Sequence, residues 1–361
     1  MDAGTQQQPS ISSRQYDDEG NGEEDEHRFA LEPLIRERGV DEFVELMKLK
    51  RKGWEAESLD HHFQQQRIVA DNSGEKETRI WFIRMRGVLS EINDASRCIP
   101  AKREMSFLDV GCCPGGFTSY IMSTNRRATG VGISLEVESG GHESIISPKL
   151  MKKFHIIYAD LTYFRFTSTH YEDERLRDIP NCIREQRYDL ILLDAHHLRK
   201  QAKNVGWNYH RLQIAQLIIA LMAIGDNGTI VMKLSNPHRD FPAQMLYMLD
   251  VLSLNLILCK PTSMHGNRGT FYAIAKGFGL GSQCTRSDVF LKGLQELWVQ
   301  LTFGGEEGKG RYMKRGDLDF VVTMECLAEH YVDRLVDLCR GVWAVQAEAL
   351  RNMFRRKGIS V

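Results

Sequence analysis

Between residues 107 and 278, short apolar runs alternate with longer stretches in which apolar residues recur every three or four positions. The short runs are rich in Ile, Leu, Val and Phe with little polar alternation, which is typical of strands buried on both faces. Strands are predicted at residues 107–111, 129–134, 154–160, 189–195, 228–235, 254–259 and 270–278. The clearest helices between them are predicted at Gly116–Ser123, Gly206–Ile224 and Asp240–Leu252. This alternation predicts an α/β fold: a seven-stranded, mostly parallel, doubly wound sheet with helices on both faces.

The flanking parts of the chain have different patterns. Apolar stripes predict helices over residues 29–52 and 78–93, separated by a polar segment at 71–77, and two more over 287–302 and 323–356. The first 27 residues are polar and acidic, so they bury too little apolar surface to offset the entropy of ordering them. We therefore predict a disordered acidic tail (1–27), a helical extension (28–77), the sheet domain (78–280) and a helical C-terminal extension (281–361).

Composition narrows the class of protein. With 47 Lys and Arg against 48 Asp and Glu, the formal net charge is −1, so strong global attraction to nucleic acid or membranes is not expected, although a local basic groove is compatible with it. There is no apolar run of about 18 residues to span a membrane and no apolar secretory leader. The eight cysteines are dispersed without a C-x-x-C pair, which favours reduced thiols over disulfides or a zinc site. An intracellular protein of the cytoplasm or nucleus is predicted, with no metal and no membrane partner.

The segment FLDVGCCPGGFTSYI (107–121) is the strongest candidate for chemistry. A predicted strand ends at Asp109 and Gly111, and a Pro-Gly-Gly turn then opens a helix. Glycines allow a ligand to approach the backbone closely, and a helix N-terminus presents free N–H groups. The dinucleotide fingerprint G-x-G-x-x-G and the P-loop pattern are absent, which disfavours a nicotinamide cofactor and a P-loop nucleotide. A turn of this kind without any cofactor is the alternative.

The run DVGCCPGGFTSY resembles the S-adenosylmethionine-binding loop of the FtsJ-like ribose 2′-O-methyltransferases, in which D-L-G-x-x-P-G-G precedes Phe or Trp. The resemblance extends over about residues 78–278. It implies a Rossmann-like methyltransferase fold, S-adenosyl-L-methionine as cofactor and RNA as substrate. Within the loop, the cofactor-binding residues that it implies are Asp109, Gly111, Cys112, Pro114, Gly115, Gly116 and Phe117.

The resemblance places two more acids near the cofactor. Asp160 ends a predicted strand where the family has an acid close to the adenine, and a carboxylate there would accept a hydrogen bond from the exocyclic amine. An Asp that caps the following segment is the alternative. Many methyltransferases bind the ribose through an acid at the end of the second strand, and Glu136 lies slightly beyond that position.

The family's catalytic set is Lys-Asp-Lys-Glu, and the resemblance assigns two of its members. Asp194 matches the Asp at the end of the fourth strand, where it would also face the cofactor, and Lys233 matches the second Lys near the end of the fifth. Open α/β sheets bind ligands at this edge. As a neutral amine, Lys233 could take the proton of a ribose 2′-hydroxyl, with Asp194 orienting it. A buried structural ion pair is the alternative for these two residues.

The other two members of the set are replaced. Ile83 stands where the family has its first Lys, and Arg84 follows it, about 100° further around a helix. Thr270 stands at the position of the Glu and offers a hydroxyl in place of a charge. Three hypotheses therefore remain: an RNA 2′-O-methyltransferase that acts in rRNA processing or other RNA methylation, an inactive relative that serves as an RNA-binding or scaffold module, and a methyltransferase with another acceptor.

Basic and histidine residues provide the other candidate contacts. His196 and His197 follow Asp194, and one of them could be a substitute base or a substrate contact; a loop histidine without a role is the alternative. Two groups of cations could neutralise RNA phosphates at the mouth of the cleft, or lie on solvated faces. These groups are Arg79, Arg84, Arg86, Arg97, Lys102 and Arg103, and Arg199, Lys200 and Lys203.

Overall fold

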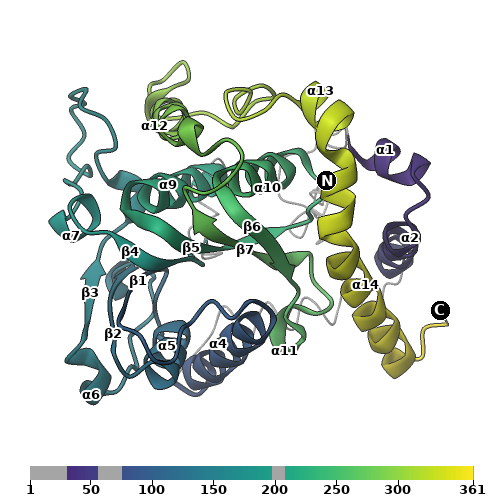
Figure 1. Cartoon of the computed structure of the whole chain (residues 1–361), viewed down its shortest axis with the longest axis horizontal. Helices are drawn as coiled ribbons and strands as arrows, with labels where there is room; N and C mark the ends of the chain where they lie inside the picture. The colour runs from purple at the N-terminus through teal and green to yellow at the C-terminus, as the bar shows by residue number, and fades with distance from the viewer. Residues whose placement is uncertain (1–30, 56–74, 197–207, 361) are drawn as a thin grey trace, which may run out of the picture.

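The computed structural model describes residues 31–55, 75–196 and 208–360 (Figure 1). Its centre is a seven-stranded sheet with the order β3-β2-β1-β4-β5-β7-β6. All neighbours are parallel except β7, which runs antiparallel to β5 and β6. The strands are β1 (Met105–Val110), β2 (Ala128–Ser134), β3 (Phe154–Tyr158), β4 (Tyr188–Leu193), β5 (Ile224–Ser235), β6 (Ser253–Cys259) and β7 (Thr270–Phe278). The predicted mostly parallel sheet with seven strands is confirmed.

Helices cover both faces of this sheet (Figure 1). Helices α4 and α5 lie on one face, and α9, α10 and α12 lie on the other. The longer helices are α1 (Leu31–Glu37), α2 (Asp41–Glu55), α4 (Glu75–Ser96), α5 (Gly116–Thr124), α9 (Asn208–Ala223), α10 (Asp240–Leu252), α12 (Ser287–Phe303) and α14 (Val332–Lys357). The short ones are α6 (Pro148–Met151), α7 (Asn181–Arg184), α11 (Thr262–His265) and α13 (Met324–Cys326), with single turns η3 (Val137–Ser139), η4 (Leu161–Tyr163), η5 (Cys284–Arg286) and η6 (Leu327–Tyr331).

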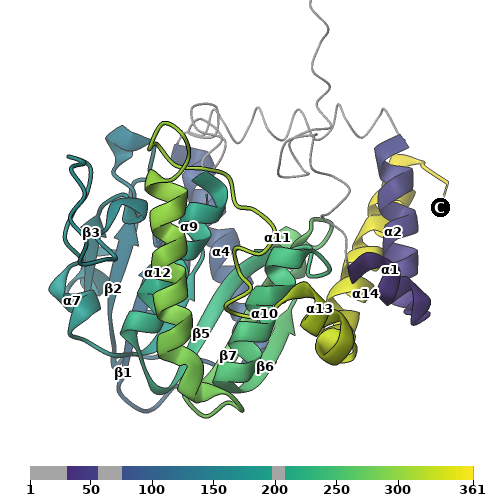
Figure 2. The ribbon, with the colours of Figure 1, turned by 90° about the horizontal axis from the view of Figure 1, so that it is seen from above.

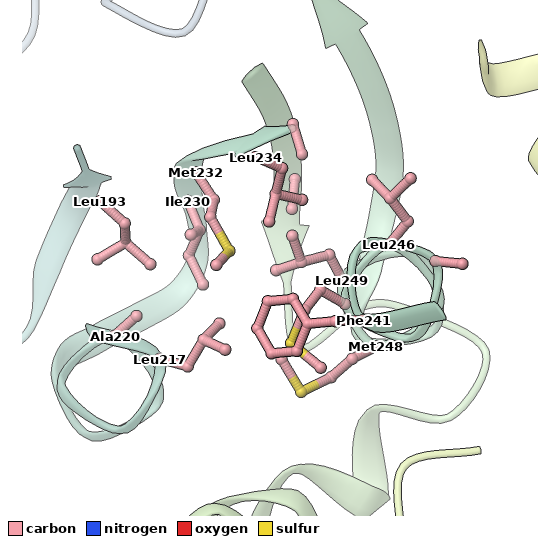
Figure 3. Close-up of a cluster of buried hydrophobic side chains, with 14 of the residues drawn as sticks. Leu193, Leu217, Ala220, Ile230, Met232, Leu234, Phe241, Leu246, Met248 and Leu249 are labelled. Atoms are coloured by element: carbon pink, nitrogen blue, oxygen red, sulfur yellow. The ribbon is translucent and has the colours of Figure 1, made fainter. Parts of the chain in front are cut away.

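The larger hydrophobic core lies between the sheet and the layer of α9 and α10 (Figure 3). Leu193 of β4 and Met232 of β5 project from the sheet toward Leu217 of α9 and Phe241 of α10. Each of these four side chains is at most 9% exposed. Burial on this scale supplies the dominant favourable term in folding. It also holds the carboxyl ends of β4 and β5 in a fixed position relative to α9 and α10.

Three predicted helices differ from the observed ones. The stretch 29–52 is divided into α1 and α2 because Gly39, at φ 61°, takes a left-handed conformation that ends the first helix. Part of the polar segment 71–77 is helical, since α4 begins at Glu75. The stretch 323–356 contains α13, a π-helical turn (η6) and α14 in place of one continuous helix. The predicted tail (1–27) lies outside the described residues.

The N- and C-terminal extensions pack against the sheet domain and against each other. Helix α14 lies beside α2 and β6 at one end of the molecule (Figure 2), where the rings of Phe43 and Trp343 are 4.9 Å apart. Helix α12 packs against α9, and the indole of Trp298 donates a 2.9 Å hydrogen bond to the carbonyl of Thr162 in η4. Both extensions therefore share one hydrophobic core with the sheet. Within the described ranges no helix combines the length and apolarity needed to span a bilayer.

Candidate active site at the carboxyl edge of the sheet

The loop after β1 is held by the strand on each side of it. The N–H of Gly111 donates to the carbonyl of Ile133 in β2 (2.8 Å), and the N–H of Asp194 donates to the carbonyl of Val110 (3.0 Å). Gly111 has φ 90°, which only glycine adopts without strain. The carboxyl ends of β1, β2 and β4 therefore meet around this loop, as predicted for a ligand-binding edge.

The glycines of the loop serve the packing of the chain itself. A Cβ on Gly111 would lie 2.6 Å from the nitrogen of Ala195, and one on Gly115 would lie 2.2 Å from Ile146. A Cβ on Gly116 would lie 2.7 Å from Met85 of α4. The close approaches seen are between segments of the protein, and the role of these glycines in ligand approach stays a prediction. Because these positions lack a Cβ, the end of β4, the loop before α6 and helix α4 can all pack closely against the turn after β1.

Asp109 carries an unpaired oxygen in this loop. Its Oδ2 accepts a 2.7 Å hydrogen bond from the Thr118 hydroxyl, while its Oδ1 is buried and has no hydrogen-bond partner among the described residues. Burial raises the pKa of Asp109 to about 7; the Thr118 hydrogen bond opposes this shift, and the negative charge of Asp194 adds to it. A buried acceptor without a partner is costly unless a donor is brought to it, so the loop fits a ligand that carries hydrogen-bond donors.

The raised pKa of Asp109 predicts a pH effect on stability. Between its ordinary pKa of 3.8 and about 7, the folded chain holds a proton that the unfolded chain has released, so the free energy of unfolding falls as the pH rises through this window. Asp109→Asn cannot titrate. The variant is therefore expected to gain stability over the wild type on going from pH 4 to pH 8, by up to about 4 kcal/mol. Urea unfolding at both pH values measures the difference; parallel pH profiles of the two proteins would contradict the assignment.

Asp194 and Lys233 form the central contact of the site. Lys233 Nζ lies 3.2 Å from Asp194 Oδ1 and donates to the backbone carbonyl of Asp194 at 2.6 Å. The hydroxyl of Tyr272 donates to the same Oδ1 at 2.8 Å. The Lys233 and Asp194 side chains are 15% and 9% exposed, so solvent screens this pair far less than a surface pair.

Strand register places these groups on one face of the sheet. Lys233 of β5 lies directly opposite Tyr272 of the antiparallel strand β7. Asp109 of β1 pairs with Leu192 of β4, two positions before Asp194. Since side chains alternate between faces, Asp109, Asp194, Lys233 and Tyr272 all project from the face covered by α4 and α5. The face covered by α9 and α10 is apolar at the same level.

His196 completes the surroundings of the amine. Its Nδ1 lies 3.1 Å from Lys233 Nζ and 3.3 Å from the carbonyl of Asp194. The positive charge of Lys233, together with burial, lowers the pKa of His196 to about 4. The imidazole is therefore neutral at pH 7, and Nδ1 can accept a hydrogen bond from the ammonium group. His197 lies outside the described residues.

Comparison with known families identifies the domain. The sequence model of the FtsJ-like methyltransferases matches residues 84–278, which is more than half of the chain. The chain belongs to the FtsJ-like methyltransferase family. A comparison with curated protein sequences gives no match.

Solved structures that match the chain at low similarity include methyltransferases. A ribosomal RNA methyltransferase from Plasmodium falciparum is 18% identical with a TM-score of 0.38, and the alignment covers 55% of this chain and 98% of that one. A TehB-like SAM-dependent methyltransferase from Corynebacterium glutamicum is 14% identical with a TM-score of 0.31 over 60% of this chain and 97% of that one. A fibrillarin/Nop5p complex is 13% identical with a TM-score of 0.35 over 55% and 84%.

The two acids predicted to face the cofactor lie beyond β2 and β3 of the FtsJ-like domain. Asp160 follows β3, and its Oδ1 accepts from the N–H (3.0 Å) and hydroxyl (2.6 Å) of Thr162 at the start of η4. The capping alternative is thus observed, and it uses one of the two carboxylate oxygens. Glu136 follows β2 and forms a 3.4 Å ion pair with Arg177. This contact gives Glu136 a protein partner at the position considered for ribose binding.

The two replaced catalytic positions lie on α4 and β7. Helix α4 passes the start of α5, where Phe82 and Met85 surround Gly116, and between them Ile83 is 66% exposed and Arg84 is also exposed. Thr270 is the first residue of β7, two positions before Tyr272, so its side chain lies on the same face of the sheet as that of Tyr272. Thr270 is half-buried. Its carbonyl accepts a 2.6 Å hydrogen bond from the buried Lys260.

Two residues of the site were missed by the sequence analysis. Tyr272 bonds Asp194 directly, and Gln216 of α9 accepts from the N–H of Ala195 (3.0 Å) and donates to its carbonyl (3.1 Å). Gln216 thereby fixes the peptide that follows Asp194. The antiparallel pairing of β7 with β5 would have indicated Tyr272, since it sets that residue opposite Lys233. A glutamine in an apolar helix carries no comparable signal.

The predicted basic group before β1 is divided between the two edges of the sheet. Arg84 and Arg86 lie on the half of α4 that passes the start of α5, whereas Arg103 pairs with Asp189 at the beginning of β4 (3.3 Å). Arg97 and Lys102 precede β1 and so lie at the amino edge as well. The expectation that the whole group flanks the cleft was therefore wrong, because α4 itself runs from the carboxyl edge to the amino edge, where its last residue, Ser96, accepts a hydrogen bond from Lys276 of β7. Arg199, Lys200 and Lys203 lie outside the described residues. Among the residues that the structure describes, no three His, Cys, Asp or Glu side chains cluster as potential metal ligands.

Proposed function

We propose that this chain is an S-adenosylmethionine-dependent methyltransferase that methylates ribose 2′-hydroxyls of RNA. The observation that carries the proposal is the buried Tyr272–Asp194–Lys233 chain at the carboxyl edge of an FtsJ-like domain, next to a loop that holds an unpaired Asp109 oxygen. The loop after β1 would hold the methionine part of the cofactor, and Asp160 the adenine.

The residues of the site suit proton removal from a hydroxyl. S-adenosylmethionine, when bound, supplies an electrophilic methyl group. The ammonium group of Lys233 would first release a proton to solvent, and the neutral amine would then take the hydroxyl proton during attack. The resulting ammonium has three N–H groups, and three acceptors surround it: the carbonyl and Oδ1 of Asp194, and Nδ1 of His196. Tyr272 holds Asp194 in place through Oδ1.

Titration of the full chain with S-adenosylmethionine tests the cofactor assignment. We expect micromolar binding, and at least a tenfold loss in Asp160→Asn. Asn at this position keeps the cap with its oxygen, but it presents an NH₂ group where the adenine amine needs an acceptor. Asp189→Asn is the matched control, because Asp189 also accepts a hydrogen bond from a backbone N–H but lies at the amino edge of the sheet. The affinity of this variant for S-adenosylmethionine should equal that of the wild type. Equal affinities of all three proteins would contradict the assignment.

The inactive relative is the second candidate, because Ile83 is exposed on α4 and Thr270 replaces a charged residue. Methyl transfer from labelled cofactor to total RNA, followed by nuclease digestion and nucleoside analysis, separates the hypotheses. Label in 2′-O-methylribonucleosides supports the proposed function. Label in a base selects another acceptor, and cofactor binding without any transfer selects the inactive relative.

A further inference from the structure

A groove of about 940 Å³ lies between α11 and the C-terminal half of α14, outside the site described above. One wall is formed by Thr262, Met264 and Asn267 in and after α11, and the other by α14 from Ala344 to Arg356. The α14 wall is about 18 Å long at 1.5 Å rise per residue. Figure 1 shows α11 beside the lower half of α14. The two walls touch at Gly266 and at Asn267, whose amide contacts the sulfur of Met353 at 3.3 Å.

The polar groups of the groove are mainly hydrogen-bond donors. Arg355 and Arg356 are exposed at one end, and within the described ranges no carboxylate lies within ion-pair distance of either. Among the described residues, each guanidinium donates a hydrogen bond only to Asn352 of its own helix, at 3.2 Å. The one acid in the lining, Glu348, accepts hydrogen bonds from Arg351 (2.9 Å) and Asn352 (3.1 Å). The surface therefore has an excess of positive charge and of free donors, and it fits a ligand that presents only acceptors.

Helix α11, which forms one wall of the groove, also contacts the surroundings of the candidate active site. His265, the last residue of α11, is buried with its ring 6.0 Å from that of Tyr272, which bonds Asp194. Helix α11 follows β6, whose carboxyl end lies at the same edge of the sheet as those of β4 and β5. A strand of nucleic acid whose ribose lies at Lys233 would pass along α11 into this groove.

We propose that the α11–α14 groove binds the phosphate backbone of the RNA next to the methylated nucleotide, with Arg355 and Arg356 contacting phosphates. This inference rests on the proposed function for the identity of the substrate. Arginine presents a planar fork of donors that matches phosphate oxygens, and neutralised phosphates release counterions. Since α14 lies outside the FtsJ-like region, the groove would add substrate contacts that the catalytic domain alone lacks.

The test is the affinity of the full chain for a fluorescent single-stranded RNA at several salt concentrations, measured by anisotropy without cofactor. In Arg355→Ala/Arg356→Ala we expect about a tenfold loss of affinity, and the slope of log K against log salt should become shallower by about 1.4. Arg126→Ala/Arg127→Ala removes an equal charge from adjacent exposed arginines at the amino edge, and it should change neither quantity. Ala344→Trp, which fills the groove without changing charge, should lower the affinity and leave the slope unchanged.

The outcomes separate this inference from the proposed function. The inference about the groove is overturned if Arg355→Ala/Arg356→Ala binds RNA with the affinity and salt slope of the wild type. It is also overturned if the wild-type chain binds no RNA, which would leave the groove to a protein partner. An equal loss in the Arg126/Arg127 variant also overturns it, since any cation would then serve. If RNA binding depends on the groove but no methyl transfer occurs, the groove stands and only the proposed enzymatic function fails.

Discussion

Replacement of Lys233 by Met is expected to lower the rate of methyl transfer to RNA by about 10³-fold, while the affinity for S-adenosylmethionine stays within about threefold of the wild type. Met preserves most of the length of the side chain but cannot accept a proton, and positioned acid–base groups contribute about 10² to 10⁴ in rate. Single-turnover transfer of labelled methyl groups measures the rate, and calorimetric titration measures the affinity.

Lys276→Met provides the matched control for this experiment. Lys276 of β7 is half-buried, as Lys233 of β5 is, and it also donates to a backbone carbonyl, that of Ser96 at 2.6 Å. It lies, however, at the opposite edge of the sheet. Its replacement should cost stability without a comparable loss of rate. A Lys233→Met protein that turns over at the rate of the wild type would show that another group takes the proton, and His196 would be the first candidate.

Trp298→Ala is expected to destabilise the chain by about 3–5 kcal/mol and to weaken S-adenosylmethionine binding by about tenfold at temperatures where the variant is folded. The indole is fully buried, packs edge-on against Phe166, and donates to the carbonyl of Thr162, whose N–H and hydroxyl hold Asp160. Its removal leaves a cavity beneath η4 and frees the segment that would contact the adenine. Thermal unfolding and cofactor titration give the two quantities.

Trp343→Ala separates the loss of stability from the loss of the cofactor contact. Trp343 is also fully buried, but it packs between α14 and α2, against Phe43. We expect a similar loss of stability and an unchanged cofactor affinity in the folded variant. Equal weakening of cofactor binding by both substitutions would mean that the effect is a general consequence of lost stability.

The sheet was predictable because its central strands, such as β4 and β7, are buried on both faces and therefore almost entirely apolar. All seven strands are visible in the sequence within a few residues of their observed ends. Helix ends were harder to predict where the decisive feature is conformational. Gly39 ends α1 through a positive φ, and the π-helical turn η6 lies against α10, where the Tyr331 hydroxyl donates to Asp250. The packing of the extensions onto the sheet was not predicted, because contacts such as Trp298 with Thr162 join residues far apart in sequence.

The candidate site was predictable where the family motif fixes the residue and the strand end fixes its place, as for Asp109, Asp194 and Lys233. Their roles remain predictions. Tyr272 and Gln216 have no motif, and their contribution depends on register and on a helix that approaches from across the sheet. The cations before β1 misled for the opposite reason: they are close in sequence, but the chain crosses from one edge of the sheet to the other between them.

The hydrogen bond between Trp298 and Thr162 has a consequence for synthesis of the protein. The segment that presents Asp160 belongs to the first half of the chain, but the side chain that supports it arrives with α12, more than a hundred residues later. Chains fold from the N-terminus as the ribosome extends them, at about 5–20 residues per second. A nascent chain can therefore form β1 to β4 and their loops while the turn that holds Asp160 still lacks its support. Full affinity for the cofactor is therefore expected only after α12 has been synthesised, and chains terminated before Trp298 should bind the cofactor more weakly than the complete chain.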